Sequence, residues 1–88
     1  MDNQHKMIKG YRDLSQEEID AMNLVKGRAQ NVSETVTYVE RMVDKMPEDT
    51  EAEIAEKAEA ARWLNEGKME LQKGFMAVTR AIARPTSF

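Results

Sequence analysis

A short segment near the N-terminus, residues 5–12, combines the side chains that bind phosphorylated ligands. Its members with this chemistry are His5, Lys6, Lys9, Gly10, Tyr11 and Arg12. Lysine and arginine donate charge-assisted hydrogen bonds to phosphate oxygens, and a tyrosine ring stacks on nucleobases at about 1–3 kcal/mol per base. The segment therefore predicts anion binding. A plainer alternative stays open, in which Tyr11 covers the end of a helical core and the cations are only solvated.

Catalytic chemistry has little support in the sequence. The chain has one histidine, His5, and no cysteine, so a nucleophile with a neighbouring base is not evident. The glutamates between residues 51 and 59 fit a solvated helix face, and phosphate-binding glycine loops and paired metal ligands are missing. We predict a binding protein without catalytic residues, metal or cofactor.

The charge of the chain is divided between its ends and its middle. Residues 1–12 have a net charge of +2 and residues 68–88 of +3, whereas residues 13–67 have −8. An acidic middle would repel long nucleic acid, so a small anion held near the basic ends is the better expectation. Charged residues make up 33% of the 88-residue chain, a composition that predicts no membrane partner and a cytoplasmic location.

The first predicted helix spans residues 16–46 and follows an arm at residues 1–14. Ser15 and Glu18 form a capping box, and Leu14 and Ile19 occupy the positions of a hydrophobic staple. An apolar seam then repeats at alternating steps of three and four residues until Pro47. Its members are Met22, Val25, Ala29, Val32, Val36, Val39, Val43 and Met46. Lys26 lies in the early turns, on the same side of the helix as Met22.

The second predicted helix spans residues 51–84 and precedes a short tail at residues 85–88. Thr50 and Glu53 form a second capping box, and Pro85 ends the helix. A short loop between two long helices makes them antiparallel neighbours. The prediction is an all-α, single-domain, two-helix hairpin whose basic ends meet at its open end.

The second helix has a less even apolar pattern than the first. We expect its seam to begin at Ile54, Ala58 and Ala61 and to finish at Leu71, Phe75, Val78 and Ile82, with a shift of the contact face near Trp63 and Leu64. Small residues also recur every seven positions, at Ala60, Gly67, Gly74 and Ala81. This stripe fits close packing of the two helices, packing between subunits, or contact of the Gly74 backbone with a ligand.

The size of the chain predicts self-association. A single core this small supplies only about 3–5 kcal/mol, and without cysteine no disulfide adds to it. Folding and assembly of a homo-oligomer would then be coupled.

Residues 5–26 and 71–88 resemble the phage anti-CBASS sponge family, CBASS being cyclic-oligonucleotide-based antiphage signalling. This family shares its helical hairpin domain with one class of anti-Thoeris sponges. The resemblance implies a compact homo-hexamer in the cytoplasm of the infected bacterium, which sequesters cyclic di- and trinucleotides without cleaving them. The rival interpretation is a structural or adaptor coiled coil whose basic end binds a protein partner.

The resemblance also implies two classes of pocket. In the cyclic dinucleotide pocket, at the junction of paired subunits, Tyr11 would stack on a base and Lys26 would contact a phosphate. Cyclic trinucleotides would bind near a three-fold axis. Further contacts predicted from charge and location are Lys9, Gly10, Arg12, Arg80, Thr86 and Ser87.

Overall fold

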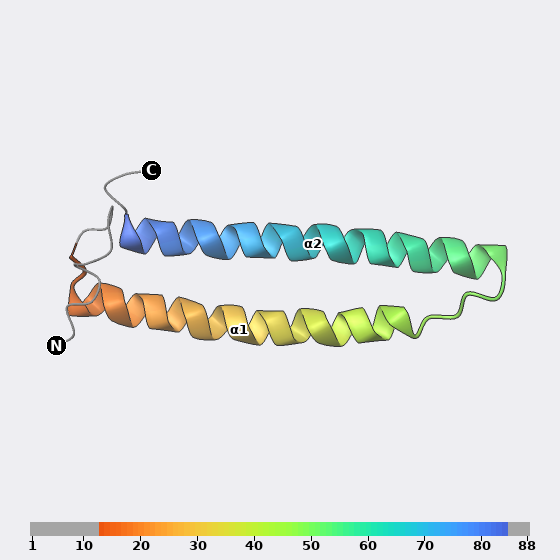
Figure 1. Ribbon diagram of the computed structural model, residues 1–88, viewed down its shortest axis with the longest axis horizontal. Helices are drawn as coiled ribbons and strands as arrows, with labels where there is room; N and C mark the ends of the chain where they lie inside the picture. Colours follow the sequence, from red (N-terminus) through yellow and green to blue (C-terminus); the bar gives the residue numbers. More distant parts are fainter. Residues whose placement is uncertain (1–12, 85–88) are drawn as a thin grey trace.

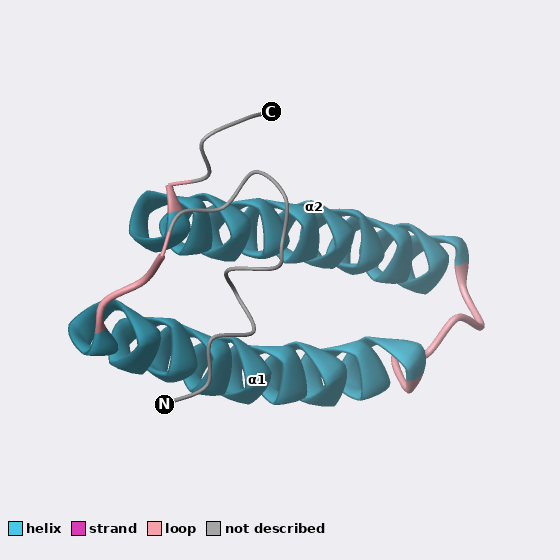
Figure 2. Ribbon diagram, turned by 60° about the vertical axis from the view of Figure 1, so that its left-hand side comes forward, coloured by secondary structure: helices cyan, strands magenta, loops and turns pink. Residues whose placement is uncertain are grey.

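The chain folds into a long antiparallel pair of helices. The computed structural model describes residues 13–84, in which α1 spans Gln16–Asp44 and α2 spans Glu51–Ala83. The molecule measures 59 × 24 × 17 Å, so its length is set by the helices themselves. The start of α1 and the end of α2 lie at one end, and the connecting turn lies at the other (Figure 1). A second view shows the helices side by side along their whole length (Figure 2). The predicted two-helix hairpin is therefore confirmed.

Both predicted capping boxes are present and explain where the helices begin. The Ser15 hydroxyl accepts from the Glu18 N–H at 3.2 Å, and the Glu18 carboxylate accepts from the Ser15 N–H at 2.9 Å. The Thr50 hydroxyl accepts from the Glu53 N–H at 3.1 Å, with the reciprocal bond at 3.0 Å. Each box pairs two backbone donors that the first helical turn otherwise leaves unpaired.

The first helix ends at Asp44, two residues before the expected boundary at residue 46. Pro47 has no N–H and cannot donate to the Val43 carbonyl, so the last turn tightens. The Met46 N–H donates to that carbonyl instead, at 3.0 Å. At the other end of the hairpin, Arg84 follows α2 as its C-cap with φ 41°. This left-handed conformation, directly before Pro85, ends the second helix.

The seam of α1 is confirmed, because its eight predicted members are all half-buried or buried. The predicted seam of α2 was partly wrong: Ile54, Ala58 and Ala61 are exposed, and so are Leu71 and Val78. The residues that face α1 in the first half of α2 are Glu53, Lys57, Ala60 and Leu64. The long aliphatic part of a lysine side chain covers apolar surface while its ammonium group stays in water. Lys57 can therefore face α1 at a position where hydrophobicity alone predicts the neighbouring Ala58.

Three polar contacts join the helices at different levels. Near the turn, the Lys57 ammonium donates to the Asp44 carbonyl at 3.0 Å and pairs with Glu48 at 3.3 Å. At mid-length, Lys68 Nζ lies 3.4 Å from Glu40 Oε2. At the open end, Arg84 Nη2 lies 2.8 Å from Glu18 Oε2. Such directional pairs oppose sliding of one helix along the other, which a uniform apolar seam would tolerate.

A single hairpin buries little of its apolar surface. Among residues 13–84, Val43 and Ala83 are the buried apolar residues, whereas Tyr38 and Met76 are more than 70% exposed. No atom of α1 lies within 4 Å of where a Cβ would stand at Gly67 or Gly74. Close packing of α1 on α2 therefore does not explain these two glycines, and the hairpin leaves this part of the stripe open, whereas Ala60 faces α1.

Candidate functional site

A groove between the two helices is the candidate site. Its volume is about 550 Å³, within the range of about 300–1,000 Å³ that small-molecule sites occupy. Its apolar lining comes from both helices, and its polar lining stands along the margins. The lining residues are Lys26, Ala29, Gln30, Val32, Ser33 and Val36 of α1, and Lys68, Leu71, Gln72, Phe75 and Met76 of α2.

The helical repeat explains how the α1 side of the groove is built. Ala29, Val32 and Val36 belong to the apolar seam, and their side chains point toward α2. Lys26, Gln30 and Ser33 follow one another at steps of four and three residues, so they form one row beside that seam. The groove therefore has an apolar floor and a polar margin on its α1 side.

Lys26 is the predicted ligand contact that the structure places at this groove. Its side chain is exposed, and within the described part of the chain it has no ion pair or hydrogen bond. Its ammonium group can therefore meet an anion without first breaking a contact to another described residue. The role of Lys26 as a phosphate contact stays a prediction.

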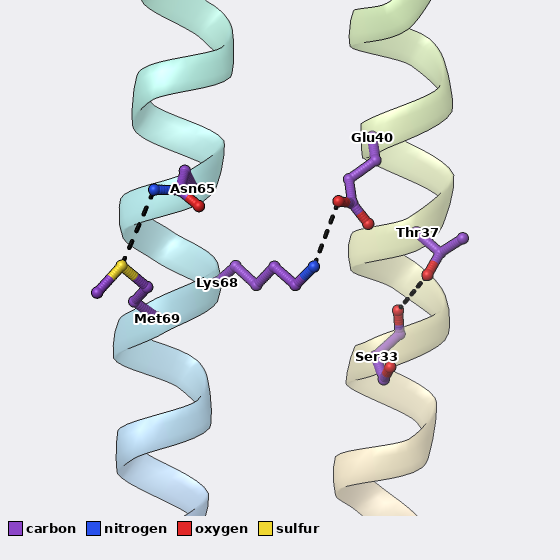
Figure 3. Close-up of polar contacts among 6 residues, drawn as sticks. All are labelled: Ser33, Thr37, Glu40, Asn65, Lys68 and Met69. Carbon is purple, nitrogen blue, oxygen red and sulfur yellow. Dashed lines mark hydrogen bonds and ion pairs between the residues drawn. The ribbon is translucent and has the colours of Figure 1, made fainter.

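Sequence reasoning did not assign Lys68, Gln30, Gln72 or Phe75 to the site. Phe75 was expected only as a core residue, and Lys68 stands where the apolar pattern of α2 is interrupted. That interruption was the available signal, because a lone cation at a seam position must find either a partner or a ligand. In the structure, Lys68 extends across the space between the helices toward Glu40 (Figure 3).

The basic residues at the end of α2 lie beyond the groove. Arg80 is exposed in the last turn of α2, four residues after Met76 and therefore on the same side of the helix. Its carbonyl accepts from the Arg84 N–H at 2.7 Å. The Arg84 guanidinium is engaged with Glu18. Arg80 is thus close to the groove along the chain but is not part of its lining.

Six of the predicted ligand contacts lie outside the described residues. These are Lys9, Gly10, Tyr11, Arg12, Thr86 and Ser87.

Across residues 13–84, no group of three Asp, Glu or His side chains is arranged to hold a metal ion. In the same range, neither helix is long and apolar enough to cross a membrane.

Comparison with known proteins gives the chain a family. No family model matches the sequence. The chain is similar to Anti-CBASS protein 2 of Pseudomonas phage JBD67, with 35% identity across an alignment that covers 97% of each protein. This similarity over nearly the whole length confirms the resemblance first seen at residues 5–26 and 71–88. The chain belongs to the family of Anti-CBASS protein 2.

Proposed function

We propose that this protein binds and sequesters cyclic oligonucleotide second messengers and so blocks CBASS signalling in the cytoplasm of an infected bacterium. The observation that carries the proposal is Lys26, a cation with no partner among the described residues on the margin of an apolar groove, in a chain of the Anti-CBASS protein 2 family. Cyclic dinucleotides are the first expected ligands and cyclic trinucleotides the second. The ligand leaves the protein chemically unchanged.

The proposed dinucleotide pocket uses two copies of the chain. A cyclic dinucleotide repeats one base and one phosphate, so a two-fold junction offers each half the same residues. Tyr11 of each copy would stack on a base, and Lys26 of each copy would contact a phosphate. The further ligand contacts proposed are Lys9, Gly10, Arg12 and Arg80 for a trinucleotide pocket, and Thr86 and Ser87 as a tail that closes a neighbour's pocket.

The same proposal includes a homo-hexamer. Its support is the shortage of burial in one hairpin, where Val43 and Ala83 are the buried apolar residues of the described chain. Large apolar side chains such as Tyr38, Trp63 and Met76 remain 57–73% exposed. Gly67 and Gly74 leave room for the close approach of another backbone. Burial of these surfaces between copies would supply the stability that the single core lacks.

Isothermal titration calorimetry against a panel of cyclic di- and trinucleotides tests the function. Saturable binding of at least one of them is expected, and heat denaturation should return that ligand intact, as judged by chromatography. Linear di- or mononucleotide products would instead reveal a hydrolase. Failure to bind every member of the panel would contradict the proposal.

The second candidate is a structural or adaptor hairpin that binds a protein partner. The exposed Trp63 favours it, since this ring is 57% exposed and held by Glu59 and Arg62 on its own helix. An ordered aromatic residue at the surface is typical of a protein interface. Loss of function in Trp63→Ala with unchanged nucleotide affinity and unchanged oligomer size would favour this candidate.

A further inference from the structure

The groove between α1 and α2 has a lysine near each of its ends. Lys26 is its first residue on α1, where the lining runs to Val36 over about 15 Å at 1.5 Å per residue. Lys68 is its first residue on α2, whose lining runs to Met76. Because the helices are antiparallel, Lys26 stands toward the open end and Lys68 toward the turn. Between them lies the apolar floor, which includes Leu71 and Phe75.

The charge of this lining is opposite to that of the chain. The two lysines are its charged residues, and it contains no carboxylate, whereas the whole protein has a net charge of −3. An apolar floor with a cation near each end is complementary to a ligand that has both a flat apolar part and negative charge. A nucleobase that carries phosphate is such a ligand, and the glutamines Gln30 and Gln72 on opposite margins offer hydrogen bonds to its edge.

The ion pair between Lys68 and Glu40 is suited to exchange. Its N–O distance is 3.4 Å, longer than the roughly 2.7–2.9 Å of a strong charge-assisted hydrogen bond. Both side chains are about 40% exposed, with values of 43% and 40%. Exposed pairs of this kind contribute little to stability, so an anion that reaches Lys68 can replace Glu40 without disrupting the hairpin.

We propose that Lys68 is the second anion contact of this groove. A ligand phosphate replaces the Glu40 carboxylate as the partner of the Lys68 ammonium. The base lies on Leu71 and Phe75, and Lys26 binds negative charge at the opposite end of the groove. This inference rests on the proposed function for the identity of the ligand, a nucleotide. It adds Lys68, a residue of α2, to the proposed binding site. It also makes Glu40 a competitor of the ligand for Lys68, which lowers the affinity for the ligand.

Calorimetry with cyclic di-AMP tests the inference in four variants. Lys68→Met keeps the apolar stem and the helix, removes the charge, and should weaken binding about tenfold or more. Glu40→Gln frees Lys68 and should strengthen binding a few-fold. In the double variant, the gain from Glu40→Gln should vanish, because the two residues act through one contact. Lys73→Met, the matched control on the same helix but outside the lining, should bind as the parent does.

A second ligand separates failure of this inference from failure of the proposed function. The fluorescent anion 1-anilinonaphthalene-8-sulfonate has an aromatic body and one negative charge, and it needs no nucleotide-specific contact. If no cyclic nucleotide binds the parent but this dye binds with dependence on Lys68, the groove inference holds and the proposed function fails. If cyclic di-AMP binds equally to the parent and to Lys68→Met, the inference is wrong and the proposed function stands.

The alternative occupant of the groove is a second copy of this chain, and measurement of oligomer size tests for it. Sedimentation velocity of the parent, Lys68→Met and Phe75→Ser should give the same assembly if the groove holds a ligand. Dissociation of Phe75→Ser, together with no effect of Lys68→Met on binding, would assign the groove to subunit contact and overturn the inference.

Discussion

Arg84 and Glu18, 66 positions apart in the chain, lie in contact at the open end of the hairpin, with Arg84 Nη2 2.8 Å from Glu18 Oε2. The other oxygen of the same carboxylate, Oε1, accepts the Ser15 N–H at 2.9 Å. One side chain therefore caps the start of α1 and binds the residue that ends α2. This contact joins the start of α1 to the end of α2 at the open end of the hairpin. The predicted ligand contacts outside the described residues belong to the segments that precede and follow these two ends in the sequence.

Glu18→Gln should separate these two roles of Glu18. The amide retains an acceptor for the Ser15 N–H but loses the charge that pairs with Arg84. Since Arg84 is 65% exposed, the expected loss of unfolding free energy is small, about 0.5–1 kcal/mol. Urea denaturation at a fixed protein concentration measures it, and Glu18→Ala should lose more because the capping box is lost as well. Equal losses in both variants would assign the whole effect to the ion pair.

Gly74→Leu should prevent assembly without overpacking the single hairpin. In one hairpin the space beside Gly74 is open, and leucine forms helix better than glycine by roughly 0.5–1 kcal/mol. If the stripe packs against another copy, the added side chain overpacks it at a cost of about 1–3 kcal/mol per site. Sedimentation equilibrium should show smaller species, and the helical circular dichroism should fall with assembly because folding and assembly are coupled. A parent-sized assembly of Gly74→Leu would show that the stripe faces solvent.

Lys26→Glu should abolish cyclic dinucleotide binding without changing oligomer size. The substitution places a negative charge at the groove margin, where Lys26 has no partner among the described residues and its loss breaks no internal contact. Calorimetry and sedimentation on the same samples provide the two measurements. Lys73→Glu on the exposed surface is the charge-matched control and should bind normally. If Lys26→Glu retains the parent affinity, the phosphate contact lies elsewhere.

Tyr11→Ala tests the stacking role that the family resemblance implies. Loss of stacking removes about 1–3 kcal/mol per base, and a two-fold pocket loses two copies of the ring. Dinucleotide affinity should therefore fall at least about a hundredfold. Tyr11→Phe is the control, because it keeps the ring and removes only the hydroxyl. Unchanged affinity in Tyr11→Ala would exclude this residue from the pocket.

Val43→Ala and Met42→Ala compare the interior of the hairpin with its outer surface. Val43 is 6% exposed and Met42 is 56% exposed. In an isolated hairpin, truncation of Val43 should cost about 1–3 kcal/mol, and truncation of Met42 should have little effect. Urea denaturation across a range of protein concentrations measures both. A cost for Met42→Ala that grows with concentration would show that a neighbouring copy covers this face.

Features that depend on residues three or four positions apart were predictable from the sequence. The helices begin at two capping boxes, Ser15 with Glu18 and Thr50 with Glu53, and they end close to Pro47 and Pro85. Both signals are local, because caps and prolines act on the nearest turn. The α1 seam was equally clear, since nearly all of its members are apolar and the pattern has one phase. Pro85 placed the end of the second helix within one residue, because the predicted helix included Arg84, which instead follows α2 as its C-cap.

The facing side of α2 was decided only by packing against α1. Apolar residues flank its true seam, so the pattern allowed Ile54, Ala58 and Ala61, whereas the structure places Glu53, Lys57, Ala60 and Leu64 toward α1. Lys57 and Lys68 can occupy this seam because acceptors on α1 and in the turn stand at matching levels. The groove has the same origin: Lys26 was visible as a candidate, but its place on one groove with Phe75 and Lys68 exists only once the antiparallel register is set. Sequence periodicity describes one helix at a time, and register is a property of two.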